Sequence, residues 1–453
     1  MIKFEQYFYT ISFRAWWMRR GFANLIEGKG RSFFQFLIKH YAKLKPLLQW
    51  VDPKIRSRFK AIILRSVFKM IYSVESDISY DTGLKKGVNL IGYPHADIGE
   101  GEFVRQTARS FSRIDVEFGI YNCTLENQLS QNDQRLASFT RPDNPYAINI
   151  FHLKPDQVEA SIIRLGESFV AGRLNIGYWV WELSEFPDAW MGPLKYFHEI
   201  WCPSRFVQSA VSDCSTRPVL YMPPAFEIEE PKGFDRAYFK LPEDRFLYLF
   251  VFDFKSYISR KNPLGCIQAF QNAFPKGNKT VGLVIKSMDG HQYPAEFKGL
   301  NEATRSDPRI TCIDATFTSE EVTGLMSVCD TFVSLHRSEG IGLSIAQSML
   351  LGKPVITTNY SGNTDFTRPD NSCLVDYKLT PVKEGEYQFW EGQVWADPDL
   401  DHAVEHMRRL AEDKTYRDTV AQAGRSYIKT FHNPEVAGKT YRSRLVELGL
   451  LKS

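Results

Sequence analysis

The sequence lacks the features of a secreted, disulfide-stabilised or membrane-spanning protein. Its seven cysteines are scattered, odd in number and never in Cys-x-x-Cys spacing. This argues against a disulfide framework or a zinc site and for a reducing compartment. No uninterrupted apolar run is long enough to span a bilayer, and the N-terminus has no clean signal peptide. We therefore expect a cytoplasmic protein.

The chain is too long for a single ordinary hydrophobic core. It has 453 residues, of which 43% are hydrophobic and 24% charged, as in soluble globular proteins. Chains of this length usually fold as two or three domains.

The net charge of +3 hides an uneven distribution. Residues 1–70 contain 15 Lys and Arg against 3 Asp and Glu, whereas the rest of the chain contains 41 basic and 50 acidic residues. Bulky aromatics are interleaved with these charges, and apolar residues recur at helical spacing in 32–45 and 55–71. Basic aromatic helices suit an anionic membrane surface, and we favour this interpretation for 1–72. Packing on the main body is the alternative. Nucleic acid is disfavoured because no recognition module accompanies the charge.

From about residue 86 onward, apolar runs alternate with helical periodicity, which predicts an α/β fold with parallel strands. Strands are predicted over 88–93, 116–120, 147–152, 174–181 and 199–202, with helices after Pro155 and Ser204. A linker is predicted over 221–225 and 227–245. The second half has predicted strands over 246–252, 281–285, 310–313, 331–335 and 355–357, a helix over 264–273 and helices from Asp399 onward.

The most informative stretch runs from Ser334 to Ile356. An apolar run ends near Glu339, a Gly340-x-Gly342 turn opens a helical segment, and a second apolar run follows. This predicts strand, loop, helix and strand, with a carboxylate where ligands bind in open parallel sheets. N–H groups at a helix N-terminus favour anions, so a carboxylate there suits another task, such as holding hydroxyl groups. The alternative is that Glu339 merely favours the helix dipole.

Basic residues also stand between predicted strands and helices. Arg260 and Lys261 lie before the 264–273 helix, and Lys286 follows the strand over 281–285. Cations at such positions can neutralise a pyrophosphate leaving group.

The first half offers weaker candidates. Gly99 and Gly101 form a predicted strand-to-helix turn but lack the third glycine of the dinucleotide fingerprint, so the signal for NAD is weak. His152 ends a predicted strand, where it is either a ligand contact or an ordinary core histidine. The aromatic and acidic segment 179–190 suits sugar rings, but core tryptophans are equally common.

Together these residues resemble the retaining nucleotide-sugar glycosyltransferases of family 4, over roughly residues 87–435. Glu339 with Gln347 eight positions on resembles the E-x7-E signature, and 261–263 resembles the phosphate-binding basic loop. The segments 352–356 and 361–366 resemble the strand and loop that follow, 99–101 the N-domain glycine loop, and 179–190 a stretch of polysaccharide-assembly members.

The sequence departs from the family pattern at two positions. The second glutamate of the signature is Gln347, which can accept a hydrogen bond without the charge. The usual arginine five residues before Lys261 is Ser256, and Arg260 or Lys286 would supply the charge instead.

The resemblance implies a GT-B fold: two facing Rossmann-like domains with parallel sheets, here with a basic helical extension. We predict the extension over 1–75, an acceptor domain over 76–240, a nucleotide-sugar domain over 241–430 and a C-terminal helix over 431–453 that crosses back to the acceptor domain. No metal or cofactor is implied. The implied catalytic residues are Glu339, Lys261 and His152; the donor-binding residues are Arg260, Lys286, Gly340, Ile341, Gly342, Leu343, Gln347, Asn363 and Asp365; the acceptor-side residues are Gly99, Gly101, Glu102, Trp181 and Glu182.

The resulting hypothesis is a retaining, metal-independent hexosyltransferase. It would use GDP-mannose or a UDP-hexose and a glycan or lipid-linked acceptor in surface polysaccharide or lipopolysaccharide synthesis, at the inner face of the cell membrane. Two alternatives stay open: a GT-B nucleotide-sugar epimerase or hydrolase, and a non-catalytic glycan-binding protein, which Gln347 makes conceivable.

Overall fold

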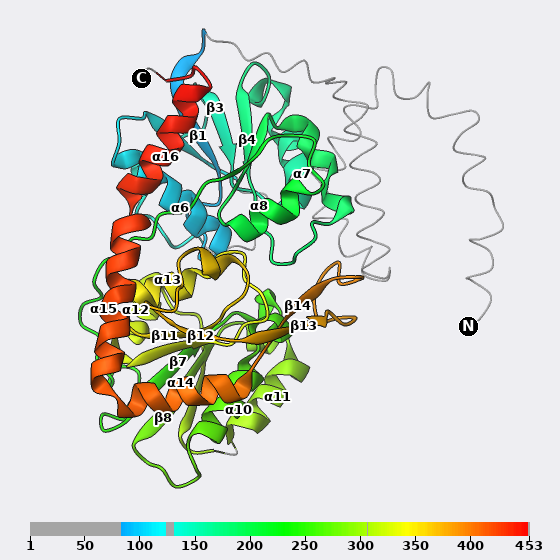
Figure 1. Ribbon diagram of the computed structural model, residues 1–453. Helices are drawn as coiled ribbons and strands as arrows, with labels where there is room; N and C mark the ends of the chain where they lie inside the picture. Colours follow the sequence, from blue (N-terminus) through cyan, green and yellow to red (C-terminus); the bar gives the residue numbers. More distant parts are fainter. Residues whose placement is uncertain (1–82, 124–130, 306, 452–453) are drawn as a thin grey trace, which may run out of the picture. The chain divides into compact units, whose positions relative to one another are not determined.

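A computed structural model describes residues 83–123, 131–305 and 307–451 (Figure 1). The chain divides into two compact units, one of residues 1–77 and 157–169 and the other of residues 78–156 and 170–453. The described part of the first unit comprises most of helix α7 (Pro155–Leu165) and the short helix η3 (Glu167–Phe169). The predicted N-terminal helices lie outside the described residues.

The second unit begins with a six-stranded parallel sheet in the order β2-β1-β3-β4-β5-β6. Its strands are β1 (Lys85–Gly92), β2 (Phe118–Asn122), β3 (Tyr146–Phe151), β4 (Leu174–Tyr178), β5 (Glu199–Cys202) and β6 (Val219–Tyr221). Its helices within this unit are α6 (Gly99–Ser112) and α8 (Arg205–Ser212), with short helices η2 (Ala137–Phe139), η4 (Asp188–Trp190) and η5 (Gly192–Tyr196).

Three buried asparagines run across the centre of this sheet. Asn89, Asn149 and Asn175 are register partners on β1, β3 and β4. The Asn89 amide donates to Asn149 Oδ1 at 2.9 Å, and the Asn149 amide donates to Asn175 Oδ1 at 2.8 Å. Buried polar groups need partners, so a one-residue slip of any strand would leave amides unpaired. The ladder therefore fixes the strand register.

A second six-stranded parallel sheet follows, in the order β12-β11-β10-β7-β8-β9. Its strands are β7 (Phe246–Val251), β8 (Val281–Ser287), β9 (Ile310–Asp314), β10 (Thr331–Ser334), β11 (Val355–Thr358) and β12 (Cys373–Val375). The helices are α9 (Ile258–Lys261), α10 (Pro263–Ala273), α11 (Pro294–Arg305), α12 (Ser319–Val328), α13 (Leu343–Leu350), α14 (Leu400–Glu412), α15 (Lys414–Phe431) and α16 (Pro434–Glu447), with η6 (Phe254–Ser256), η7 (Gly290–Gln292) and η8 (Gly362–Asp365).

Helices cover both faces of the second sheet (Figure 1). On one face, α10 and α14 contribute Phe270 and Met407 to the core. On the other face, α12, α13 and α15 contribute Leu325, Met349 and Ile428. Burial on both faces explains why these strands read as continuous apolar runs in the sequence.

The C-terminal helix α16 packs against the first sheet's layer, beside α6 (Figure 1). Its Tyr441 ring lies 5.4 Å from the Trp201 ring and 5.9 Å from the Phe111 ring. The Arg444 guanidinium pairs with buried Glu199 at 2.6 Å. The end of the chain is thus fixed to the half in which the described chain begins.

The structure confirms the predicted α/β fold with two parallel sheets and corrects several details. Strand β6 occupies 219–221, so Tyr221 ends a strand instead of opening a linker. The residues before α10 form a short helix, α9, rather than a loop. Strand β12 and an antiparallel hairpin of β13 (Tyr377–Pro381) and β14 (Val394–Pro398) were not predicted. Short or exposed strands carry little apolar periodicity, which is why the sequence did not reveal them.

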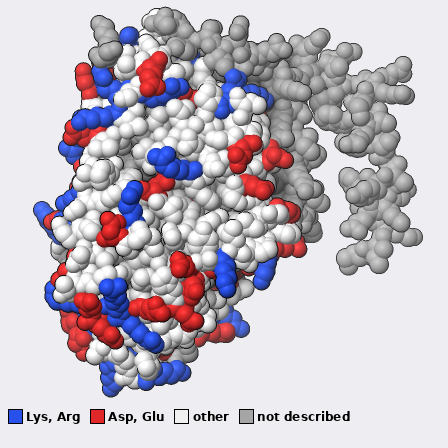
Figure 2. All heavy atoms as spheres, viewed as in Figure 1, with Lys and Arg blue, Asp and Glu red and all other residues white. Residues whose placement is uncertain are grey.

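Both signs of charge are interspersed over the coloured part of the face shown in Figure 2. Within the described residues, no helix is long and apolar enough to cross a membrane. All seven cysteines lie in the described part of the chain, and no disulfide joins them.

Candidate functional site

The loop between β10 and α13 carries Glu339, as the sequence predicted. Gly342 is the N-cap of α13 and has φ +82, a conformation that favours glycine. The loop is held from the neighbouring segment: the Ser361 hydroxyl accepts the Glu339 N–H at 2.8 Å, and the Gly362 N–H donates to the Glu339 carbonyl at 2.9 Å. A Cβ at Gly362 would lie 2.1 Å from the Gly340 carbonyl oxygen, so the two loops meet backbone to backbone.

The Glu339 carboxylate is buried between two cations. The Lys261 ammonium lies 2.5 Å from its Oε1, and an Arg260 guanidinium nitrogen lies 3.1 Å from its Oε2. Burial alone would raise the pKa of Glu339, but Lys261 and Arg260 outweigh it and lower the pKa to about 2. Burial lowers the pKa of Lys261, although Glu339 opposes the shift. Two of the three predicted catalytic residues are thus brought together.

The two cations differ in how fully they are paired. Arg260 is 3% exposed, and it also donates to the Ser256 carbonyl at 3.1 Å and the Ser338 carbonyl at 2.9 Å. Within the described residues, Glu339 is the one hydrogen-bond partner of the Lys261 ammonium, which has three donors. Arg260 therefore orients the loop and Glu339, and Lys261 keeps donors for a ligand.

A residue from the first half completes this charge chain. Glu182 Oε1 lies 3.9 Å from Arg260, and Glu182 Oε2 accepts the Tyr387 hydroxyl at 2.6 Å. Tyr387 belongs to the connection between β13 and β14, residues 382–393, which we call the strap. Gln393 of the strap also exchanges hydrogen bonds with the Glu185 backbone at 3.2 and 2.8 Å. The strap therefore holds Glu182, and Arg260 lies between Glu182 and Glu339.

Lys286 lies inside β8 and not after it. Its ammonium donates to the Ala315 carbonyl at 2.7 Å and lies 5.0 Å from the Phe317 ring centroid. Burial lowers its pKa to about 8. Among the described residues, no contact joins Lys286 to Lys261 or Glu339, so its donor-binding role stays a prediction.

Asn363 and Asp365 have structural partners. Asn363 is fully buried, donates to the Thr358 carbonyl at 2.9 Å and lies 3.1 Å from His336 Nε2. Asp365 accepts the Arg205 N–H at the start of α8 at 2.8 Å. Burial raises the pKa of Asp365. Their predicted donor-binding roles remain untested, but both side chains already hold the loop that supports Glu339.

The remaining donor-side residues line the start of α13. Gly340 packs closely against the first half, because a Cβ added at this position would lie 2.6 Å from Val180. The Gly340 carbonyl accepts a hydrogen bond from the Ser204 hydroxyl at 2.7 Å. Ile341 is a core residue, 5% exposed, and Leu343 is the first residue of α13. Gln347 is partly buried on the same helix.

His152 follows β3 and is 2% exposed. Its ring lies 4.7 Å from the Tyr178 ring, and neither ring nitrogen has a hydrogen-bond partner in the described structure. Burial lowers its pKa to about 3, so the ring is neutral near pH 7. An unpaired buried imidazole is costly, which makes His152 a continuing candidate for ligand contact.

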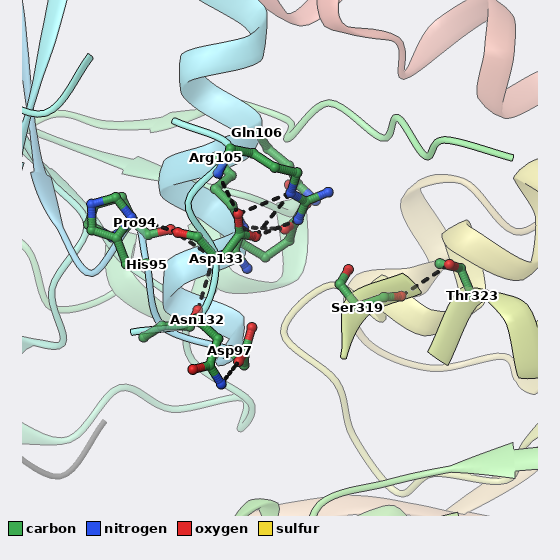
Figure 3. Close-up of polar contacts among 12 residues, drawn as sticks. Pro94, His95, Asp97, Arg105, Gln106, Asn132, Asp133, Ser319 and Thr323 are labelled. Atoms are coloured by element: carbon green, nitrogen blue, oxygen red, sulfur yellow. Dashed lines mark hydrogen bonds and ion pairs between the residues drawn. The ribbon is translucent and has the colours of Figure 1, made fainter. Parts of the chain in front are cut away.

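The acceptor-side glycines lie in the first turn of α6, so the predicted turn is helical. A Cβ at Gly101 would lie 2.4 Å from the Ala96 carbonyl oxygen, whereas a Cβ at Gly99 would meet nothing within 4 Å. Glu102 is buried and binds Arg105 at 2.8 Å and also Arg109. Figure 3 shows Arg105 of α6 directed at Asp133 and the Pro94 carbonyl. Gly101 and Glu102 thus have packing roles.

Trp181 is fully buried in an aromatic cluster with Phe186, Trp190, Tyr387 and Phe389. Its indole N–H donates to the Glu185 carbonyl at 2.8 Å. Its predicted contact with acceptor sugar stays untested, and its burial favours the core interpretation.

Sequence reasoning missed three residues at the site. Tyr387 and His336 contact predicted residues, and Tyr257 has the strained backbone described below. His336 stands within the Ser334–Ile356 stretch, so its place beside Glu339 was a usable signal. The sequence gives no signal for the other two residues. The partner of Tyr387 is distant in sequence, and the backbone geometry of Tyr257 is not encoded in a motif.

A cavity of about 430 Å³ lies away from this site. Phe226 and Glu230 of the linker and Arg425 of α15 are among its lining residues. Among the described residues, no group of three or more His, Cys, Asp or Glu side chains is arranged to hold a metal ion, and metal independence stays a prediction.

Comparisons with known proteins agree with this geometry. Residues 232–427 match the family model of the glycosyl transferases group 1. No curated protein matches the sequence. Solved structures with similar folds include Anabaena HepE in complex with UDP and glucose, which is 13% identical, covers 80% of this chain and 100% of its own, and has a TM-score of 0.59.

Two further structures are similar at the same level. Sucrose-phosphate synthase from Thermosynechococcus elongatus is 13% identical over 80% of this chain and 99% of its own, with a TM-score of 0.59. The lipopolysaccharide outer core galactosyltransferase WaaB is 12% identical over 80% and 99%, with a TM-score of 0.54. At such identities the likeness establishes the fold. Residues 232–427 thus match the glycosyl transferases group 1 model, and the chain has a GT-B-like fold.

Proposed function

We propose that this protein transfers a hexose from a nucleoside-diphosphate sugar to a hydroxyl of a glycan or lipid-linked glycan, with retention at the anomeric carbon, as in family 4. The observation that carries the proposal is the buried Glu339 carboxylate beside Lys261 at the carboxyl end of β10. Ligands bind at this edge of parallel sheets. A cation with spare hydrogen-bond donors suits the diphosphate of a nucleotide sugar, and a carboxylate suits the hydroxyl groups of its sugar.

The roles follow from the charges. Lys261 and the amides from Gly340 to Leu343 would bind the diphosphate, whose negative charge grows as the glycosidic bond breaks. Glu339 would accept hydrogen bonds from sugar hydroxyls once Lys261 turns to the phosphate. Gln347 would hold the ribose, and His152 would contact the sugar or acceptor as a neutral ring. The acceptor oxygen bonds to the anomeric carbon, and its proton leaves with the diphosphate.

Lys261→Ala tests this assignment. We expect transfer from a radiolabelled nucleotide sugar to fall about 10²- to 10³-fold, as for loss of one donor to a developing anion. The matched control is Lys255→Ala, since Lys255 is about half-exposed and pairs with Asp289 away from Glu339. Unimpaired transfer by Lys261→Ala would refute the assignment.

We propose a UDP-hexose as donor, with GDP-mannose as the alternative. HepE, of similar fold, was solved in complex with UDP and glucose and with UDP-glucose, which supports the first choice. At equal saturating concentrations, a ligand that binds more tightly stabilises the folded protein more, by RT ln(1 + [L]/Kd). In a screen across nucleotide sugars, the largest rise in melting temperature should therefore come from a UDP-hexose. A larger rise with GDP-mannose than with every UDP-hexose would reverse the choice.

We further propose action at the inner face of a membrane, in surface polysaccharide synthesis. The basic excess in 1–70 supports membrane contact, with each Lys or Arg near an anionic surface worth about 1 kcal/mol. WaaB, of similar fold, is named for lipopolysaccharide. Deleting residues 1–72 should release the protein from anionic liposomes but leave its weak binding to neutral liposomes unchanged. Retained binding to anionic liposomes would count against this role.

A further inference from the structure

Tyr257 has a strained backbone next to the Lys261–Glu339 pair. It lies between η6 and α9 with φ +64 and ψ +110. This region is rarely occupied by bulky residues, and such strain concentrates at functional sites where the surrounding structure enforces it. Glycine would adopt this backbone more easily. A tyrosine at this position therefore suggests that its side chain has a function.

The backbone of Tyr257 ties its ring to the two cations. Its carbonyl accepts the N–H groups of both Arg260 and Lys261 at 3.1 Å. The ring therefore has a fixed position relative to Lys261, which we assign to the diphosphate, and Arg260, which orients Glu339.

The ring of Tyr257 is supported on one side and open elsewhere. It packs on Tyr387, with ring centroids 4.7 Å apart, and 36% of the residue is exposed. Tyr387 itself is 4% exposed and is held by Glu182. The strap thus supports the Tyr257 ring from behind.

The charges around Tyr257 discriminate between possible ligands. Glu182, Arg260 and Lys154 act on it electrostatically, and Lys154 pairs with Glu100 at 2.8 Å. Glu182 is only loosely paired with Arg260, at 3.9 Å, so its Oε1 can accept a hydroxyl hydrogen. These carboxylates would repel the negative charge of a phosphate group. They can instead accept hydrogen bonds from the hydroxyl groups of a ligand.

We propose that Tyr257 and Glu182 form a subsite for a sugar ring of the acceptor, in which the ring face packs on Tyr257 and a hydroxyl donates to Glu182. The electron-rich face of an aromatic ring attracts the C–H groups of a pyranose. The inference rests on the proposed function. It specifies a saccharide acceptor, held by one residue from each half of the chain.

The test uses the full chain, saturating UDP and methyl glycosides of glucose, galactose, mannose and N-acetylglucosamine as probes. In saturation-transfer NMR we expect at least one glycoside to bind the wild type. Tyr257→Ala and Glu182→Gln should reduce its signal at least five-fold, and Tyr257→Phe should retain it. The matched control is Leu264→Ala, because Leu264 is an exposed apolar residue of α10, 49% exposed.

Two measurements separate this role from a structural one. Tyr257→Gly relieves the strain, so its melting temperature should equal or exceed that of Tyr257→Ala, although both lose the glycoside. Calorimetric UDP affinity should be the same in Tyr257→Ala and the wild type. The subsite would be refuted if no glycoside bound the UDP-bound wild type, if Tyr257→Ala bound glycosides normally, or if it lost UDP. Glycoside binding through Tyr257 without any UDP binding would instead refute the proposed function.

Discussion

Each half of the second unit contains a buried ionic cluster near the start of a helix, and the two clusters differ in how fully their cations are paired. At α6, the Arg105 guanidinium binds Glu102 at 2.8 Å, approaches Asp133 at 3.3 Å, and donates to the Pro94 and Ala96 carbonyls at 2.9 Å each. Near α13, the Lys261 ammonium binds Glu339 alone among the described residues.

The difference separates structural from functional charge. Removing charges from water is costly, and a buried cation with all its donors committed stabilises the segment that supplies the acceptors. A buried cation with donors to spare remains incompletely compensated and gains from an anionic ligand. By this criterion Arg105 and its acceptors form a scaffold, and we propose that the Lys261–Glu339 pair is a binding site.

The largest effect on stability should come from breaking the α6 cluster. Arg105→Ala leaves Glu102 and Asp133 buried with fewer partners and should lower the free energy of unfolding by about 3–5 kcal/mol. Arg113→Ala is the control, because Arg113 forms an exposed pair with Glu227 at 2.7 Å and should cost less than about 1 kcal/mol. Chemical denaturation measures both. Equal losses would remove the distinction between scaffold and surface charge.

Glu339→Gln should act mainly on chemistry. The substitution removes the carboxylate that pairs with Lys261, so UDP should bind several-fold tighter. Sugar transfer should fall about 10²-fold, which corresponds to an increase of about 2.7 kcal/mol in the activation free energy. Calorimetry and UDP release under saturating donor measure the two quantities. Glu391→Gln, an exposed change on the strap, is the control. Weaker UDP binding by Glu339→Gln would mean that Glu339 supports the nucleotide and does not compete with it.

Just below pH 6.5, the smallest of these effects concerns His152, which separates burial from pairing. Its pKa is lowered to about 3, so between pH 6.5 and 3 the unfolded chain binds a proton that the folded chain does not. Stability should therefore fall as the pH drops through this range, by up to about 1.4 kcal/mol per pH unit. In His152→Phe this contribution is absent. Parallel stability curves for the two proteins would show that His152 is not buried as a neutral ring.

The sequence predicted five of the six strands in each of the two parallel sheets. Runs such as 246–252 and 355–357 are apolar because helices cover both faces of the sheet, and Glu339 and Lys261 lie in local motifs. Strand β13 of the hairpin is largely exposed and has no such pattern. The Asn89–Asn149–Asn175 ladder was also unpredictable, because each asparagine is isolated within its own apolar run.

Contacts between distant segments set the limit of sequence reasoning at the site. Glu182 was predicted as an acceptor-side residue, but its partner Tyr387 is 205 positions away. Arg260 was predicted to bind the donor, yet its hydrogen bond to the Ser338 carbonyl depends on two loops meeting. Motif spacing can identify the residues of a site. The different contacts that two neighbouring cations make are seen only in the structure.

The central claim is that Lys261 is a cation kept for the diphosphate. Its most direct test is calorimetric titration of UDP into the wild type and Lys261→Ala at low and high salt. We predict binding by the wild type, at least a ten-fold weaker affinity in the variant, and a smaller salt dependence once the cation is lost. UDP binding of equal affinity and salt dependence in both proteins would contradict the account.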